Sequence, residues 1–66
     1  MELKLSKREI EILNLLGSGF TSKEIADKLN ISVPTVISHR QNIKAKLKCI
    51  NCPQLIYKAM RLGIIK

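Results

Sequence analysis

Hydrophobic side chains recur at helical spacing in four segments of the sequence, and turn residues separate these segments. Within each segment the apolar residues lie three or four positions apart, on one side of a helix. Strict alternation of hydrophobic and polar residues, and hairpin turns of the Asn-Gly or Asp-Gly type, do not occur. The pattern predicts an all-α fold with helices at about residues 6–16, 22–29, 33–48 and 52–62. The predicted inward-facing residues are Ile10, Ile12, Leu13, Leu16, Ile25, Ala26, Leu29, Val36, Ile43, Leu47, Leu55, Ala59 and Leu62.

Each predicted helix begins at a residue whose side chain can accept a hydrogen bond from the first turn. Ser6 and Thr21 are each followed three residues later by Glu, which is the capping-box pattern. Ser32 and Asn51 are the expected N-caps of the last two helices, and a proline follows each of them within the first turn, where its missing N–H costs nothing.

Residues 21–48 predict a helix-turn-helix, in which a short helix is followed by a tight turn and a longer helix. We expect Asn30 to end the short helix, because Asn readily adopts the left-handed conformation of a turn. The first helix should end at Gly17-Ser18-Gly19 and the fourth at Gly63. With 66 residues, the chain is long enough for one domain, residues 1–66, with a small aliphatic core.

Charge is distributed unevenly along the chain. All five acidic residues lie in residues 1–27, whereas residues 28–66 hold eight bases and no acid. A one-sided positive field suits a polyanion such as nucleic acid, although lysines that serve only solubility would give the same composition. The eight bases are Lys28, Arg40, Lys44, Lys46, Lys48, Lys58, Arg61 and Lys66.

The outer side of the third helix has the composition of a DNA-binding surface. It carries small, polar and basic residues, namely Ile37, Ser38, Gln41, Lys44, Ala45 and Lys48. Gln and Ser can bond base edges in the major groove, an Ile side chain can contact thymine methyl groups, and the lysines can neutralise phosphates. Arg40 falls near the inward side, where we expect Glu9 or Glu11 to pair with it.

The fourth helix carries a second apolar strip beside its core residues, formed by Ile56, Tyr57 and Met60. One interpretation is a self-association surface that pairs two copies across a twofold axis. The alternative is that Ile64 and Ile65, or the first helix, cover the strip.

These elements together resemble the LuxR-type, or GerE-like, helix-turn-helix domain, the DNA-binding output domain of many bacterial regulators, including response regulators. The resemblance extends over nearly the whole chain, and it is specific because several spaced blocks occur together. The blocks are Leu5-Ser6-x-Arg8-Glu9-x-Glu11-Ile12-Leu13, Gly19-x-Thr21-x-Lys23-Glu24-Ile25-Ala26, Leu29-x-Ile31-Ser32, Thr35-Val36-x-x-His39 and Ile43-x-x-Lys46-Leu47.

The resemblance implies a compact four-helix bundle whose third helix binds the major groove and whose fourth helix makes a homodimer on two half-sites. It implies phosphate contacts at Thr21, Ser22, Lys23 and Thr35, and base contacts at Ile37, Ser38 and Gln41. It also implies contact with RNA polymerase. Three residues depart from the pattern: Ile37 and Cys52 stand where the family commonly has Lys and Arg, and Lys48 stands where it often has Gly.

Other chemistry has weaker support in the sequence. Cys49-x-x-Cys52 has the spacing of half a zinc site or of a redox pair, but a second pair is missing and His39 is the only His. We therefore expect no metal and no cofactor, a packing role for His39, a buried Cys49 and a helix-start Cys52. No nucleophile–base pair or phosphate loop is evident, which argues against an enzyme.

Two alternative functions stay open at this point. The promoter-recognition region of a sigma factor shares the Glu-Ile-Ala and Thr-Val pattern, and a protein-interaction module would use the apolar fourth helix instead. No signal peptide and no apolar run of membrane-spanning length is present, so we expect a cytoplasmic protein.

Overall fold

The computed structural model describes residues 5–65, and within this range the chain forms four helices and no strand. They are α1 (Lys7–Gly17), α2 (Ser22–Leu29), α3 (Val33–Leu47) and α4 (Cys52–Arg61). The predicted all-α class is confirmed, and the predicted helix bounds agree to within one residue. Lys66, one of the bases counted above, lies outside the described residues.

The predicted capping residues begin all four helices. At α1 the Ser6 hydroxyl accepts a hydrogen bond from Glu9 N–H at 3.1 Å, and the Glu9 carboxylate accepts one from Ser6 N–H at 2.8 Å. Thr21 and Glu24 form the same box at α2, with distances of 3.2 and 2.9 Å. Ser32 and Asn51 cap α3 and α4 by accepting from the N–H groups of Thr35 and Gln54.

Left-handed residues turn the chain after α2 and α3. Asn30 has a φ of 57°, as expected from the sequence, and the chain reverses there into the loop before α3. Lys48 has a φ of 56° although it has a Cβ, and it ends α3 at the position where a glycine would be free of strain.

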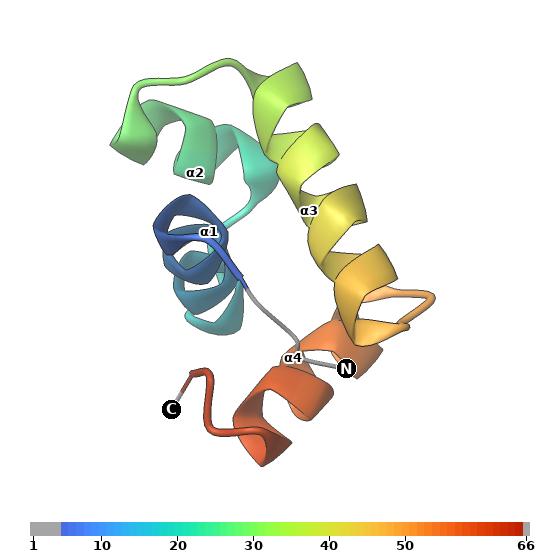
Figure 1. Ribbon diagram of the computed structural model, residues 1–66. Coiled ribbons are helices and arrows are strands. Elements are labelled where there is room, and N and C mark those ends of the chain that lie inside the picture. Colours follow the sequence, from blue (N-terminus) through green and yellow to red (C-terminus); the bar gives the residue numbers. More distant parts are fainter. Residues whose placement is uncertain (1–4, 66) are drawn as a thin grey trace.

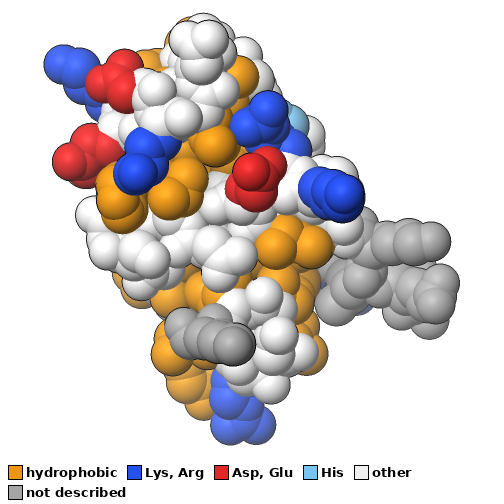
Figure 2. Space-filling model, turned by 90° about the vertical axis from the view of Figure 1, so that its left-hand side faces the viewer, with side chains coloured by type: hydrophobic (Ala, Val, Ile, Leu, Met, Phe, Trp, Pro, Cys, Tyr) orange, Lys and Arg blue, Asp and Glu red, His pale blue; other side chains and the backbone are white. Residues whose placement is uncertain are grey.

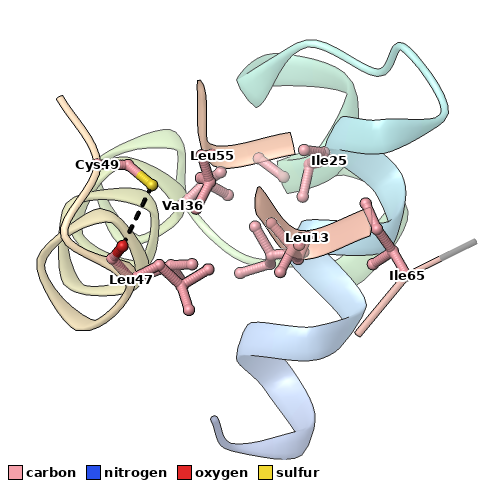
Figure 3. Close-up of a cluster of buried hydrophobic side chains, with 11 residues drawn as sticks. Leu13, Ile25, Val36, Leu47, Cys49, Leu55 and Ile65 are labelled. Atoms are coloured by element: carbon pink, nitrogen blue, oxygen red, sulfur yellow. Dashed lines mark hydrogen bonds between the residues drawn. The ribbon is translucent and has the colours of Figure 1, made fainter. Parts of the chain in front are cut away.

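The core lies where α3 crosses the other three helices, all of which pack against it (Figure 1). The close-up in Figure 3 shows side chains from α1, α2, α3 and α4 meeting there. Val36, Ile43 and Leu47 supply the contribution of α3, as the helical spacing predicts. The buried hydrophobic residues are Ile12, Leu13, Ile25, Ala26, Val36, Ile43, Leu47, Cys49, Leu55, Ala59 and Ile65.

The end of α4 differs from the prediction. Leu62 was expected in the core but is 51% exposed, because the helix ends at Arg61 and Leu62 is its C-cap. Ile65, which is 5% exposed, belongs to the core cluster instead (Figure 3). Gly17 makes room for it, since a Cβ at that position would lie 2.9 Å from the Ile65 Cδ1 atom. Ile10, Leu16 and Leu29 are half-buried rather than fully inside.

Glu9 is a buried acid that the sequence pattern did not reveal. Besides capping α1, its carboxylate accepts hydrogen bonds from Lys46 Nζ at 2.7 and 3.0 Å, which joins α1 to the end of α3. Burial raises the pKa of Glu9, but the bonds from Lys46 and Ser6 outweigh burial and hold the pKa below its ordinary value of about 4.5.

Replacement Glu9→Gln is expected to lower the free energy of unfolding at pH 7 by about 1–2 kcal/mol, because the amide keeps the shape but loses the charge. A carboxyl group with a lowered folded pKa stabilises the fold above its unfolded pKa and loses this effect as the pH falls through the folded pKa. The difference between wild type and variant should therefore shrink below about pH 4.5. Urea unfolding of both proteins at several pH values measures this difference in the free energy of unfolding.

Glu11→Gln is the matched control for this prediction. Glu11 lies on the same helix and pairs with Arg8 at 3.7 Å, but both side chains are largely exposed. An exposed pair of this kind contributes about 0–1 kcal/mol. If both variants lost the same free energy of unfolding, or if the effect of Glu9→Gln did not change with pH, the stabilising role of the Glu9–Lys46 pair would be contradicted.

Candidate nucleic-acid interface

One side of α3 faces solvent along its whole length, because the other helices pack against its opposite side (Figure 1). On this open side Ile37, Ser38, Gln41 and Lys48 are exposed, and Lys44 is half-buried. The structure therefore brings together on one surface the residues that the sequence predicted for DNA contact there. We call these five residues the α3 face.

The α3 face is free of acidic side chains, because α3 itself contains none. The acids among the described residues all lie on α1 and α2. Figure 2 shows the side of the molecule that is turned away from the open side of α3, and acidic, basic and hydrophobic side chains are mixed there. The positive charge of the domain is thus not balanced locally at the α3 face.

The N-terminus of α2 presents free hydrogen-bond donors next to this surface. The Thr21 hydroxyl accepts the N–H of Glu24 and the Thr21 carbonyl accepts that of Ile25, whereas the N–H groups of Ser22 and Lys23 have no partner among the described residues. The Lys23 side chain is exposed. Such a helix start is suited to an anion because its N–H groups and its dipole favour negative charge.

Thr35 lies exposed in the first turn of α3, close to the N-cap of that helix. Its hydroxyl is 2.7 Å from the hydroxyl of Ser32, which also accepts a bond from Thr35 N–H at 3.3 Å. The Thr35 hydroxyl, which is predicted to contact a phosphate, is thus held beside the Ser32 hydroxyl at the N-terminus of α3.

The predicted ion pair of Arg40 with Glu9 or Glu11 is wrong. The Arg40 guanidinium donates hydrogen bonds to Ser22 Oγ on α2 and to Cys52 Sγ on α4. A helical projection gives the angle of a residue about the axis but not which part of a neighbouring helix lies opposite it. Lys46 lies about 9 Å further along α3 than Arg40 and about 120° around the helix axis from it, and Lys46 is the residue that reaches Glu9.

The sequence gave no signal for the link between Ser22, Arg40 and Cys52. Ser22 is 18 positions from Arg40, and Cys52 is 12 positions from it, so only the packing of the helices brings the three together. The guanidinium thereby connects the start of α2, the middle of α3 and the start of α4.

The cysteines lie as the sequence predicted, and neither forms a disulfide. Cys49 is buried and its thiol donates to the Leu47 carbonyl at 3.4 Å (Figure 3), whereas Cys52 begins α4. His39 is half-buried on α3. Within residues 5–65, no three His, Cys, Asp or Glu side chains are placed to hold a metal ion.

The outer face of α4 remains largely open. Tyr57 and Met60 are 63% and 54% exposed, and Ile56 is half-buried. Ile65 packs into the core, so the C-terminal tail does not cover Tyr57 and Met60. The alternative in which the tail or α1 covers the whole strip is therefore wrong for these two residues.

Basic residues border the same face of α4. Arg61 lies over the Tyr57 ring at 5.9 Å and donates to its hydroxyl at 3.4 Å. Lys48, Lys58 and Arg61 line a shallow hollow that connects the end of α3 to α4. The apolar surface on α4 is thus edged by positive charge.

None of the helices in the described part of the chain has the length and apolar character needed to cross a membrane. The described surface includes three distinct features: a basic, acid-free face on α3, a donor-rich start of α2 and an apolar strip on α4.

Comparisons with known proteins agree with this arrangement. Residues 3–59 match the model of the family described as bacterial regulatory proteins, luxR family. The oxygen regulatory protein NreC of Staphylococcus aureus is 44% identical over 62 residues, which are 94% of this chain and 29% of NreC. The chain thus spans less than a third of the length of this relative.

Two solved structures are similar over nearly the whole chain. The transcription factor GerE superposes with a TM-score of 0.91 at 36% identity, covering 100% of this chain and 97% of GerE. Vibrio cholerae VqmA, solved as a complex with ligand and DNA, gives a TM-score of 0.90 at 34% identity and covers 97% of this chain and 28% of VqmA. The family consists of transcription regulators and is not an enzyme family. Given the family match, the shared fold and the helix-turn-helix, the chain belongs to the luxR family of bacterial regulatory proteins, as a DNA-binding domain.

Proposed function

We propose that α3 lies in the major groove of double-stranded DNA and that the α3 face determines which sequence is bound. The observation that carries this proposal is the open, acid-free side of α3, where Ile37, Ser38 and Gln41 project beyond the core. A major groove is wide enough to admit one α-helix, and each base pair presents a distinct pattern of donors and acceptors there. The basic C-terminal half and the family support the same conclusion.

Each residue of the α3 face has a defined role in this proposal. Gln41 can form two hydrogen bonds with adenine, and Ser38 can donate to or accept from a base edge. Ile37, which is 42% exposed, replaces the lysine common in the family and favours a thymine methyl contact. Backbone phosphates would be held by the lysines and by the helix starts, through Thr21, Ser22, Lys23, Thr35, Lys44 and Lys48.

The proposed assembly on DNA is a homodimer that uses the α4 strip of Ile56, Tyr57 and Met60. The exposure of Tyr57 and Met60 supports it, because large apolar side chains left open on a small domain mark an interaction surface. A twofold dimer places its two recognition helices on two half-sites of a symmetric operator.

Two further expectations concern the regulator to which this domain belongs. Contact with RNA polymerase, implied by the family, stays a prediction, as does a cytoplasmic location, where DNA is accessible to the domain. Since the chain spans 29% of NreC, the signal and the regulated genes would be set by the regulator as a whole.

Selection of bound duplexes from a random DNA pool, at stated salt, tests the proposal directly. A symmetric motif with two half-sites is expected. Absence of any sequence preference over competitor DNA would refute the proposal. Strong self-association without DNA, unchanged in variants of the α3 face, would instead support a protein-interaction module.

Two substitutions on the α3 face should have different signatures. Lys44→Ala is expected to weaken binding to all sequences and to lower the slope of log K against log[salt] by about 0.9, because one phosphate contact is lost. Gln41→Ala should relax the preference at one base position by about 1–3 kcal/mol while leaving the salt slope unchanged. Fluorescence anisotropy with matched and mismatched duplexes measures both.

Lys28→Ala is the control for the lost charge. Lys28 lies at the far end of α2, over the Phe20 ring at 5.2 Å, and away from the α3 face. At about 0.15 M salt such a distant charge is largely screened. A Lys28→Ala effect as large as that of Lys44→Ala would mean that only the total charge matters.

A further inference from the structure

The Arg40 guanidinium lies among groups that carry no negative charge. Its two recorded partners are the Ser22 hydroxyl and the Cys52 thiol, which are the first residues of α2 and α4. No acid pairs with it among the described residues, and its Nε atom is buried without a partner. A cation placed against two helix N-termini has an unfavourable electrostatic environment unless an anion lies nearby.

The bond from Arg40 determines what the Ser22 hydroxyl can do. A hydroxyl has one proton to donate and two lone pairs that accept. Since Arg40 Nη1 donates to Ser22 Oγ, one lone pair is occupied and the hydroxyl proton has no acceptor within the described chain. The proton therefore points away from Arg40, and because Ser22 is only half-buried, a group outside the domain can accept it.

The surroundings of Ser22 identify the kind of acceptor that would fit. The free N–H groups of Ser22 and Lys23 and the exposed Lys23 side chain are in the same turn. The one acid of that turn, Glu24, accepts the Thr21 N–H at 2.9 Å. These donors together suit a phosphate group.

We propose that Arg40 is a positioning residue for binding of the DNA backbone, because it orients the Ser22 hydroxyl so that its proton is donated to a phosphate. The inference rests on the proposed function and adds a second role to α3. Its outer side contacts bases, and its inner side, through Arg40, prepares the start of α2 for the backbone. The other terminal nitrogen of the guanidinium donates to Cys52, and this bond does not involve Ser22.

A double-mutant cycle of Arg40→Met and Ser22→Ala tests this coupling. Met keeps most of the apolar stem of Arg40 but cannot donate a hydrogen bond. Each single substitution is expected to weaken binding about tenfold to a hundredfold, the effect of one hydrogen bond to a charged group. The affinity of the double variant should lie within about twofold of the affinities of the single variants, because both substitutions remove the same bond from Ser22 to the phosphate. The probe is the duplex selected from the random pool, alongside a scrambled duplex of equal length.

The salt dependence distinguishes positioning from direct contact. Neither Arg40→Met nor Ser22→Ala should change the salt slope, whereas Lys23→Ala should lower it by about 0.9. Both substitutions should weaken the selected and the scrambled duplex by the same factor, because a phosphate contact carries no sequence information. A loss of slope for Arg40→Met as large as that for Lys23→Ala would overturn the inference.

Cys52→Ala is the matched structural control. It removes the other partner of the guanidinium and leaves the bond to Ser22, so we expect a change in affinity below about twofold. Thermal melting of every variant gives the folded fraction, and affinities are compared for the folded protein at low temperature. Should Arg40→Met fail to fold, the cycle is run with Arg40→Lys, for which a partial loss and the same coupling to Ser22→Ala are expected.

The outcomes separate this inference from the proposed function. If the wild-type chain binds DNA with sequence preference but the two substitutions act additively, the positioning role of Arg40 is refuted and the proposed function stands. If the wild-type chain shows no sequence preference, the proposed function itself is refuted.

Discussion

Replacement of Ile43 by alanine is expected to lower the free energy of unfolding by about 3 kcal/mol. Ile43 is fully buried in the middle of α3, where the other helices converge. A domain of 66 residues has roughly 3–10 kcal/mol of stability, so this loss would remove a large share of it. Urea unfolding, followed by the negative circular dichroism band of helices at about 222 nm, measures the change in the free energy of unfolding.

Ile37→Ala provides a control with the same chemical change on the same helix. Ile37 is 42% exposed, and alanine has the higher helix propensity, so the free energy of unfolding should change by less than about 0.5 kcal/mol. DNA binding should show the opposite ranking for the folded proteins, because Ile37 belongs to the α3 face. Similar stability losses in the two variants would contradict the described burial of α3.

Replacement of Met60 by lysine is expected to abolish cooperative binding to two half-sites. The outer face of α4 is apolar but edged by Lys58 and Arg61, so another positive charge would repel the partner copy as well as remove apolar contact. Affinity for a duplex with both half-sites should fall about a hundredfold or more, as the gain from bivalent binding is lost. A mobility shift would then show stepwise rather than concerted complexes.

Ile50→Lys is the control for added charge in this experiment. Ile50 is 83% exposed in the connection between α3 and α4, outside the proposed interface. Cooperativity should persist in this variant, and binding to a single half-site should be retained in both. Concerted binding by Met60→Lys would show that α4 does not form the dimer contact.

Local chemistry made the helices predictable from the sequence. Ser6 and Thr21 each have a Glu three residues later, and this spacing alone specifies the reciprocal bonds observed at α1 and α2. Asn30 turns the chain with the φ expected of a left-handed residue. The periodicity of α3 placed Val36 and Ile43 inside and the α3 face outside, because both consequences follow from 3.6 residues per turn.

Contacts between helices could not be obtained in the same way. The burial of Glu9 and the partners of Arg40 depend on how far each helix is shifted along its neighbour, and a periodic pattern carries no information about that shift. Leu62 fits the helical spacing, but α4 ends one residue before it. Ile65 lies beyond any periodic segment, so nothing in the pattern marked it as a core residue.

The double use of α3 links the folding of this domain to its affinity for DNA. Val36, Ile43 and Leu47 hold the core together from the same helix that carries Ile37, Ser38 and Gln41. The recognition helix therefore cannot detach from the core and remain ordered, and the apparent affinity equals the intrinsic affinity multiplied by the folded fraction. DNA in turn stabilises the whole fold by mass action. Substitutions far from the α3 face can thus alter gene regulation simply by changing how much of the protein is folded.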